Sequence, residues 1–179
     1  MAYHDEHGEC LVAGFDPATG NHPLRVTEKG AVVMAGRTVH IPLFTVPGVS
    51  TTLYTTADAL GTQWSIVVPP SGFIQTVLGV DLTDQGVAFD ILFFGEDFTG
   101  VADNAAFDLV DVDWRKFAGH ISIAAADYSN LAGEQVFTKT NIGFLYDAPL
   151  GKLFGQLVTR GGPTYAVDEL KLGFTILGD

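Results

Sequence analysis

VAFDILFFGEDFTGVADNAAFDLVDVDW, residues 87–114, is the stretch that decides the fold class of this chain. Residues 87–94 are apolar at every position except Asp90. Successive side chains of a strand point to opposite faces, so a strand built from this run is apolar on both faces and must be covered on both. We therefore expect it in the middle of a β-sandwich, followed by a turn at residues 95–100 and an ordered crossover rich in aspartate.

Strand-like segments and turns fill the rest of the sequence, which contains 21 glycines and 8 prolines. Residues 73–82 are predicted to pair with the apolar run as a hairpin. Residues 169–177 alternate, which predicts a strand with every second residue from Leu170 facing the core. Asp111 is expected to cap one short helix at residues 112–117. Roughly eight to ten strands without a βαβ rhythm predict an all-β chain, a β-sandwich of jelly-roll type.

The first part of the chain is predicted to form a small β-hairpin unit. Residues 24–27 and 31–34 have the composition of two short strands, joined by the turn-forming sequence Glu28-Lys29-Gly30. Two or three strands of this length are marginally stable alone. We therefore expect this unit to pack on the rest of the chain or on a neighbouring molecule.

The boundary between this unit and the body is expected at Pro47-Gly48. Residues 38–46 alternate weakly and carry Pro42, which cannot donate to a strand ladder and therefore suits an edge strand. The proline–glycine step that follows is typical of a break between ordered segments. The predicted domains are an N-terminal hairpin arm, residues 1–46, and a jelly-roll body, residues 47–179.

The charge balance excludes several classes of partner. Nine lysine and arginine residues stand against 21 aspartate and glutamate residues, which gives a formal net charge of −12. No basic cluster is present to neutralise phosphates, so neither nucleic acid nor an anionic membrane is an expected partner. Cys10 is the single cysteine, so the fold cannot rely on an intrachain disulfide. The first residues lack a basic and apolar leader, and no apolar run approaches the ~18–20 residues of a membrane span, so we expect folding in a cytoplasm.

Several residues have the chemistry of metal ligands but not the spacing. His4, His7 and Cys10 would supply three of the four ligands that a structural zinc site needs. His120 is followed by Ser122 where a cupin-type site would have a second histidine. The aspartates of the crossover do not have the spacing of an EF-hand loop, and we expect them in caps and turns. These aspartates are Asp97, Asp103, Asp108, Asp111 and Asp113.

Catalytic motifs are absent from the sequence. It contains no G-x-S-x-G, P-loop, H-E-x-x-H or G-x-G-x-x-G sequence. Glu96 and Asp97 are adjacent, so in a strand they would diverge instead of facing one glycosidic bond. We therefore predict a protein that is not an enzyme and that uses no cofactor or metal.

Five aromatic residues could instead form a sugar-stacking platform. They are Tyr54, Trp64, Phe98, Trp114 and Tyr128. Most phenylalanines of the chain occupy predicted core positions of strands, so we expect these aromatic side chains to pack in the core as well.

Three segments resemble small structural proteins of tailed bacteriophages, which are often encoded among head genes. Together, the resemblance covers roughly residues 11–34 and 50–179. The segments are residues 87–121, with Asp103-Asn104-Ala105-Ala106-Phe107 before Gly119-His120-Ile121; residues 157–177, with Leu157-Val158-Thr159-Arg160-Gly161-Gly162-Pro163 at their start; and residues 16–33, with Asp16-Pro17-Ala18-Thr19-Gly20-Asn21 at theirs.

The resemblance implies a jelly-roll decoration, or cement, protein, which sits as a homotrimer on the capsid exterior and contacts the major capsid protein. It implies no catalytic residue, and it implies a virion component assembled in the host cytoplasm. We expect the N-terminal arm to make the attachment. Its candidate capsid contacts are Arg25, Lys29 and Arg37, three of the nine basic residues, whose charges would meet acidic groups of the shell.

Two other functions stay open at this point. The first is a tail or fibre β-sandwich module that binds host glycans. An exposed row of aromatic side chains would favour it, and burial of Trp64 and Trp114 would count against it. The second is a cupin-like metalloenzyme, which bound metal would favour.

Overall fold

The computed structural model describes residues 3–4, 10–16, 20–26, 32–33 and 37–178. The chain divides into two compact units, residues 1–36 and residues 37–179. The side chains that the structure describes are those of residues 38–178.

The first unit contains an antiparallel sheet with the strand order β1-β2-β3-β4. Its strands are β1 (Tyr3–His4), β2 (Cys10–Asp16), β3 (Gly20–Val26) and β4 (Val32–Val33). β3 and β4 form the expected hairpin, in which Arg25 is opposite Val33.

The boundary between the units lies earlier in the chain than the sequence predicted. β5 (Arg37–Thr45) was expected in the arm, but it pairs along its length with the last strand of the body, from Arg37 opposite Gly178 to Thr45 opposite Lys171. The division therefore falls between Gly36 and Arg37. Pro42 does lie in an edge strand, because β5 is the last strand of its sheet.

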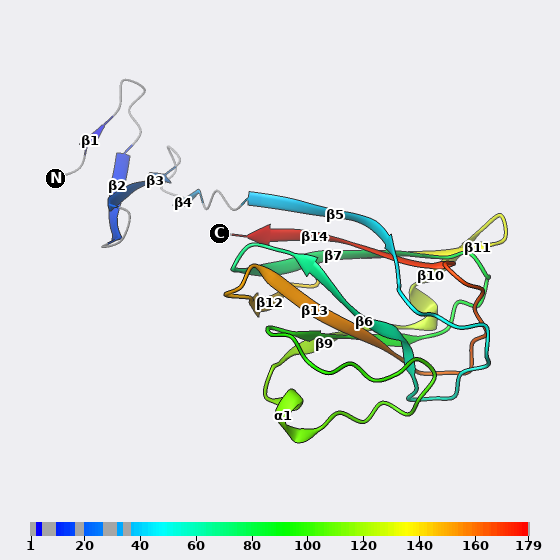
Figure 1. The fold of residues 1–179 in the computed structure, drawn as a ribbon. Helices are drawn as coiled ribbons and strands as arrows, with labels where there is room; N and C mark the ends of the chain where they lie inside the picture. The colour runs from blue at the N-terminus through cyan, green and yellow to red at the C-terminus, as the bar shows by residue number, and fades with distance from the viewer. Residues whose placement is uncertain (1–2, 5–9, 17–19, 27–31, 34–36, 179) are drawn as a thin grey trace. The chain divides into compact units, whose positions relative to one another are not determined.

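The body contains two antiparallel sheets that lie over one another (Figure 1). One has the order β10-β11-β7-β14-β5, with β12 also paired to β7, and the other has the order β6-β13-β8-β9. The remaining elements are β6 (Ala59–Val67), β7 (Ser71–Asp81), β8 (Phe89–Phe94), α1 (Asp111–Trp114), β9 (Phe117–Ile123), the 3-10 turn η1 (Ala125–Asp127), β10 (Tyr128–Leu131), β11 (Glu134–Lys139), β12 (Phe144–Asp147), β13 (Lys152–Thr159) and β14 (Leu170–Gly178).

The strand pairs are nested in the order of a jelly roll. β8 pairs with β9, β7 with β11, β6 with β13 and β5 with β14, so each pair encloses the previous one along the chain. Rolling up such a nested hairpin gives two packed sheets of antiparallel strands. The body is therefore an all-β sandwich of jelly-roll type with one short helix, as the sequence predicted.

The predicted hairpin between residues 73–82 and 87–94 is wrong, because β7 and β8 lie in different sheets. Asp81 at the end of β7 is fully buried, and its carboxylate accepts hydrogen bonds from three backbone N–H groups of the following turn. These bonds turn the chain out of the first sheet before β8 begins. Both edges of β7 are already occupied, by β14 on one side and by β11 and β12 on the other.

The main core lies between the two sheets, and β8 is covered on both of its faces, as its sequence predicts. All six residues of this strand are buried. Phe89, Ile91 and Phe93 belong to the main core, whereas Leu92 and Phe94 belong to a second apolar cluster on the outer side of the sheet. Opposite, the inward residues of β14 are fully buried as expected; they are Leu170, Leu172, Phe174 and Ile176.

Candidate interaction surface

The second apolar cluster exists because residues 95–116, here called the crossover, pass over the outer face of the β8 sheet. Phe98 and Leu109 from the crossover pack against Leu92 and Phe94 of β8 and against Val158 of β13. α1 ends the crossover on the side of the molecule away from β5, β7 and β14 (Figure 1). One face of the sandwich therefore has a separate layer of chain packed on it.

Gln156 of β13 fixes the start of this layer. It is fully buried; its Oε1 accepts the N–H of Val101 at 3.0 Å, and its Nε2 donates to the carbonyl of Val101 at 2.6 Å. The same Nε2 donates to the carbonyl of Gly61 at 3.0 Å. One side-chain amide therefore satisfies three backbone groups from two segments.

Asp103 fixes the middle of the crossover. Its Oδ1 accepts the Tyr54 hydroxyl at 2.7 Å and the N–H of Gly61 at 2.6 Å. Burial of Tyr54, followed by the hydrogen bond to Asp103, raises the pKa of the Tyr54 phenol to about 12. Asn104 beside it adopts a positive φ of 58°, a conformation that asparagine tolerates well, and its N–H bonds the carbonyl of Ala59.

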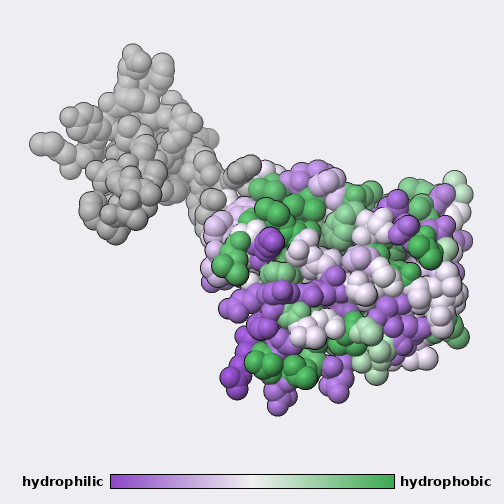
Figure 2. All heavy atoms as spheres, in the orientation of Figure 1, coloured by the Kyte–Doolittle hydropathy of each residue, from purple (hydrophilic) through white to green (hydrophobic). Residues whose placement is uncertain are grey.

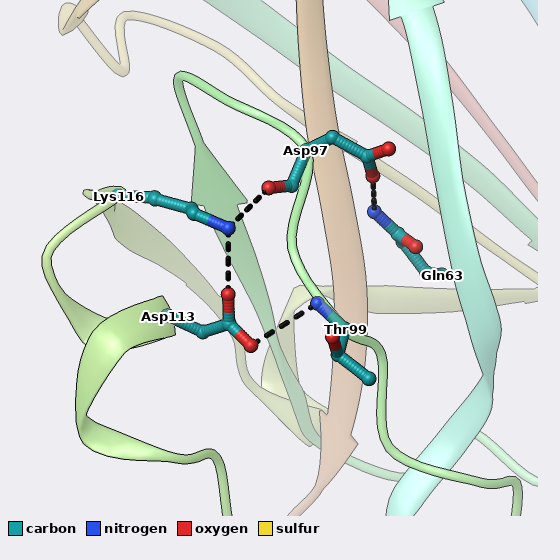
Figure 3. A network of polar contacts seen from close by, with 5 residues as sticks. All are labelled: Gln63, Asp97, Thr99, Asp113 and Lys116. Atoms are coloured by element: carbon teal, nitrogen blue, oxygen red, sulfur yellow. Dashed lines mark hydrogen bonds and ion pairs between the residues drawn. The ribbon is translucent and has the colours of Figure 1, made fainter.

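A polar network fixes the end of the crossover (Figure 3). Lys116 Nζ lies 2.7 Å from Asp113 Oδ1 and 2.6 Å from the carbonyl of Asp97. The other oxygen of Asp113 accepts the N–H of Thr99 at 3.2 Å, and Asp97 accepts the Gln63 amide at 2.8 Å. The bond from Lys116, with that from Thr99, holds the pKa of the Asp113 carboxyl below its usual range.

The helix within this network differs from its prediction. α1 covers Asp111–Trp114, starts at Val110 without a side-chain cap, and ends before Lys116. The prediction that Asp111 caps this helix is therefore wrong. Asp113 instead makes the hydrogen bonds that fix this segment to Thr99 and Lys116.

The crossover also presents an exposed apolar patch at α1, here called the α1 patch. It consists of Val110, Val112, Trp114 and Phe117, which are 61%, 58%, 42% and 36% exposed. Trp114 meets Phe117 edge to face with ring centroids 5.4 Å apart. In Figure 2, hydrophobic atoms reach the surface at the lower edge of the body, where Figure 1 places α1.

Charged residues and a groove surround the α1 patch. Asp108, Asp111 and Arg115 are exposed beside it in the chain. Phe117 also lines an open groove of about 520 Å³, together with Lys116 and with Leu145 of β12. Exposed apolar side chains with charged neighbours are typical of a surface that contacts another protein.

Four of the five aromatic side chains that could have formed a platform are buried or partly buried, as expected, but the expectation is wrong for Trp114, which is exposed. Tyr54, Trp64 and Phe98 are buried in the core, and the indole ring of Trp64 lies so close to Gly155 that a side chain there would clash with it. Tyr128 packs edge to face on the buried Phe137. One exposed tryptophan does not make a row of aromatic side chains, so these five residues form no sugar-stacking platform.

The structure also bears on the metal-ligand candidates and on the predicted capsid contacts. The crossover aspartates do not converge, and no three histidine, cysteine, aspartate or glutamate residues are placed to hold a metal ion in the part of the chain that the structure describes. Of the predicted capsid contacts, Arg25 lies in β3 and Arg37 begins β5, but their side chains are outside the described ones. Lys29 lies outside the described residues, as do the side chains of His4, His7 and Cys10.

The sequence prediction missed the α1 patch and Gln156. Apolar and acidic residues alternate from Val110 to Trp114. The sequence prediction gives Asp111 the role of a helix cap and places Trp114 in the core. Such alternation outside a strand is the signal that could have indicated an exposed segment. No local signal marks Gln156, because its partners lie 55 and 95 residues away.

The fold and this surface define a jelly-roll β-sandwich with a packed crossover and an exposed apolar patch. Comparison with family models, with curated proteins and with solved structures gave no match in any of the three. α1 has four residues, and the described part of the chain includes no helix suited to crossing a bilayer.

Proposed function

We propose that this chain is a virion structural protein and not an enzyme: a decoration protein that binds the major capsid protein on the outside of a tailed-bacteriophage head, as a homotrimer. The α1 patch is the observation that carries this proposal. Trp114 and Phe117 are exposed there in edge-to-face contact, and Val110 and Val112 are exposed in the same short segment. Three separate hydrogen-bond networks hold the crossover in place. A rigid apolar surface of this kind favours a stable protein contact, because little ordering is needed on binding.

The jelly roll and the sequence resemblance add to the proposal. Jelly rolls are common in viral capsid proteins, although the fold alone does not define a function. A capsid repeats the same contact many times, so a modest patch suffices when several copies bind through linked sites.

Three basic residues are proposed as a second contact, two in the N-terminal unit and one at the start of the body. Arg25, Lys29 and Arg37 would meet acidic groups of the shell, where complementary charge sets the rate and register of docking more than its affinity. Deleting residues 1–36, the unit defined by the structure, leaves every body strand in place and removes two of these charges.

The test uses capsid particles that lack the protein and measures how many copies bind. Val112→Asp in the α1 patch is expected to lower occupancy at least about tenfold, because a buried unpaired carboxylate weakens association. Val167→Asp is the matched control, since Val167 is 62% exposed and Val112 58%. Unchanged occupancy for both Val112→Asp and the deletion of residues 1–36 would overturn the proposed attachment.

A glycan-binding module is the second candidate, and the exposure of Trp114 favours it. Sugar rings stack on an open aromatic face, so Trp114→Ala would abolish binding to a glycan while leaving the fold intact. Binding of purified chain to host glycans with loss in Trp114→Ala would favour this function. Trp114→Ala that lowers capsid occupancy without any glycan binding would favour the decoration protein.

A further inference from the structure

The outer edge of β9 carries main-chain groups that its own sheet does not use. In an antiparallel ladder, the N–H and C=O of one residue point to the same side, and this side alternates along the strand. Among the described strands β9 pairs only with β8, and the Ser122 carbonyl accepts Lys139 Nζ of β11, in the other sheet, at 2.9 Å. The main-chain groups of Ser122 therefore point away from β8, and by alternation those of His120 do so as well.

The pairing on the other side of β8 leads to the same direction. Ala88, which precedes β8, accepts the N–H of Arg160 at 2.8 Å at the end of β13, so Phe89 faces the opposite side, toward β9. Phe89 is opposite Ile123, and alternation then gives the odd-numbered residues of β9 the bonds to β8. The N–H and C=O of His120 have no hydrogen-bond partner among the described residues.

A groove of about 440 Å³ lies beside this edge. It is lined by β9 and by residues 139–144, which connect β11 to β12. At one end Lys139 holds the Ser122 carbonyl, and at the other the ring of Phe144 lies so close to Gly119 that a side chain there would clash with it. β9 rises about 10 Å from Gly119 to Ser122, so the groove has room for about three residues of an extended chain.

The other outer edges of the sandwich are less suited to a further strand. β5 contains Pro42, which has no N–H to donate, and the pairing of β5 is irregular at this position. The outer edge of β6 is already occupied, because Ala59 bonds Asn104 and Ala105 of the crossover at 2.9 Å and 2.8 Å. β10 has only four residues. β9 combines unused main-chain groups with a groove beside them.

We infer that the β9 edge binds an extended segment of another protein, which adds to the four-stranded sheet as a fifth strand. The N–H and C=O of His120 exchange two hydrogen bonds with one residue of that segment, and the N–H of Ser122 donates a third. Side chains on the groove side of the segment contact Ile142 and Phe144, which themselves pack against the main core.

The chemistry of the groove favours a neutral segment. Lys139 is the one residue with a permanent charge among those that line it, and a 2.8 Å bond to Asp127 pairs that charge. Main-chain groups therefore supply the recognition, as in other cases of strand addition. The N-terminal unit of the chain lacks a suitable strand, since its outer strands β1 and β4 have two residues each. The inference is independent of what the α1 patch binds.

The experiment titrates the full chain with a five-residue peptide of alternating threonine and valine with blocked ends, and follows the backbone amide signals by NMR. We expect saturable shifts, largest at residues 119–123 and 139–144, with a dissociation constant of about 1 mM or lower. His120→Pro removes an N–H that the fold does not use and should weaken binding at least about fivefold. His120→Ala keeps that N–H and should bind like the wild type. Equal losses in the two variants would assign binding to the imidazole and overturn strand addition.

Lys139→Met gives a test that does not depend on a proline in a strand. It frees the Ser122 carbonyl to accept an N–H of the peptide, so binding should tighten about threefold. Lys152→Met in β13 is the matched control, because it removes an exposed lysine away from the groove, and it should leave binding unchanged. Equal affinities of the two lysine variants would overturn the assigned edge.

The same spectra identify any other occupant. Signals of residues 119–123 that move with protein concentration, without peptide, would place a second copy on the edge. Signals that move when residues 1–36 are deleted would place the N-terminal unit there. Either result, or the absence of saturable binding at about 10 mM peptide, overturns the inference and leaves the proposed capsid contact at the α1 patch untouched.

Discussion

Gln156 holds Val101 by both atoms of its side-chain amide, at 3.0 Å and 2.6 Å, across 55 residues of sequence. This pairing joins the crossover, which carries the α1 patch, to the middle of the β8 sheet. Together with the Asp103 and Asp113 networks, this buried amide sets the position of the proposed docking surface, although it is not part of the patch.

Gln156→Leu is expected to loosen the crossover. The substitution leaves the N–H and carbonyl of Val101 and the carbonyl of Gly61 without this partner, at a cost of about 1–3 kcal/mol. Hydrogen exchange followed by mass spectrometry should show faster exchange over residues 95–116. Gln75→Leu is the control, because Gln75 makes only an exposed 3.3 Å bond to Asn141. Exchange in Gln156→Leu equal to that of wild type would refute the role of the amide.

Phe93→Ala is expected to destabilise the body by about 3–5 kcal/mol, as large-to-small substitutions in a packed core do. Phe93 is fully buried and packs against Trp64, Phe144 and Phe174. Phe117→Ala removes the same side chain from the exposed α1 patch and should cost much less. Chemical denaturation measures both, and equal midpoints for the two variants would show that β8 is not the centre of the core.

The Asp113–Lys116 pair predicts a loss of stability in acid. Asp113 has a lowered pKa in the folded protein, so its contribution is present above the ordinary aspartate pKa of about 3.9 and is lost as the pH falls through the lower, folded value. Asp113→Asn should flatten the dependence of unfolding free energy on pH below about 5, and Lys116→Met should flatten the same part of the curve. An unchanged acid limb in both variants would contradict the pairing.

Two buried tyrosines are expected to respond differently to loss of the hydroxyl. Tyr54→Phe breaks the bond to Asp103 and should cost about 1–3 kcal/mol. Tyr165 is buried, but its hydroxyl has no hydrogen-bond partner among the described residues, so Tyr165→Phe should be neutral or stabilising. Thermal unfolding compares them directly, and a larger loss in Tyr165→Phe than in Tyr54→Phe would reverse the assignment.

Alkaline pH gives a second measurement on Tyr54. Because burial raises its pKa from 10 to about 12, the folded state favours the neutral phenol. Its contribution is complete below pH 10 and is lost as the pH rises through about 12. Tyr54→Phe should therefore reduce the fall in unfolding free energy between these pH values, and a slope equal to that of wild type would contradict this origin.

The sequence predicted the elements that local composition determines. β8 is apolar on both faces, β14 alternates cleanly from Leu170, and Pro42 indicates an edge strand; all three were correct. Strand pairing is harder to predict from the sequence than the strands themselves, because most paired strands are far apart in the chain. β7 was assigned to its nearest neighbour β8, whereas it pairs with β14, β11 and β12.

The domain boundary and the α1 patch were not predicted correctly, because both depend on contacts between segments that are far apart in the sequence. Pro47-Gly48 is a genuine turn, but β5 before it is held in the body by β14, more than 120 residues later in the chain. The exposure of Val112 and Trp114 depends on which face of the crossover packs on the sheet. That choice is set by Gln156, Asp103 and Asp113 together, and sequence spacing alone does not determine it.

The most direct test of the proposed function is electron microscopy of virions made from the genome that encodes this chain. We predict density for the jelly-roll body on the outside of the head, with the α1 patch against the major capsid protein. Absence of the chain from the head, or its presence only in the tail, would contradict the proposal.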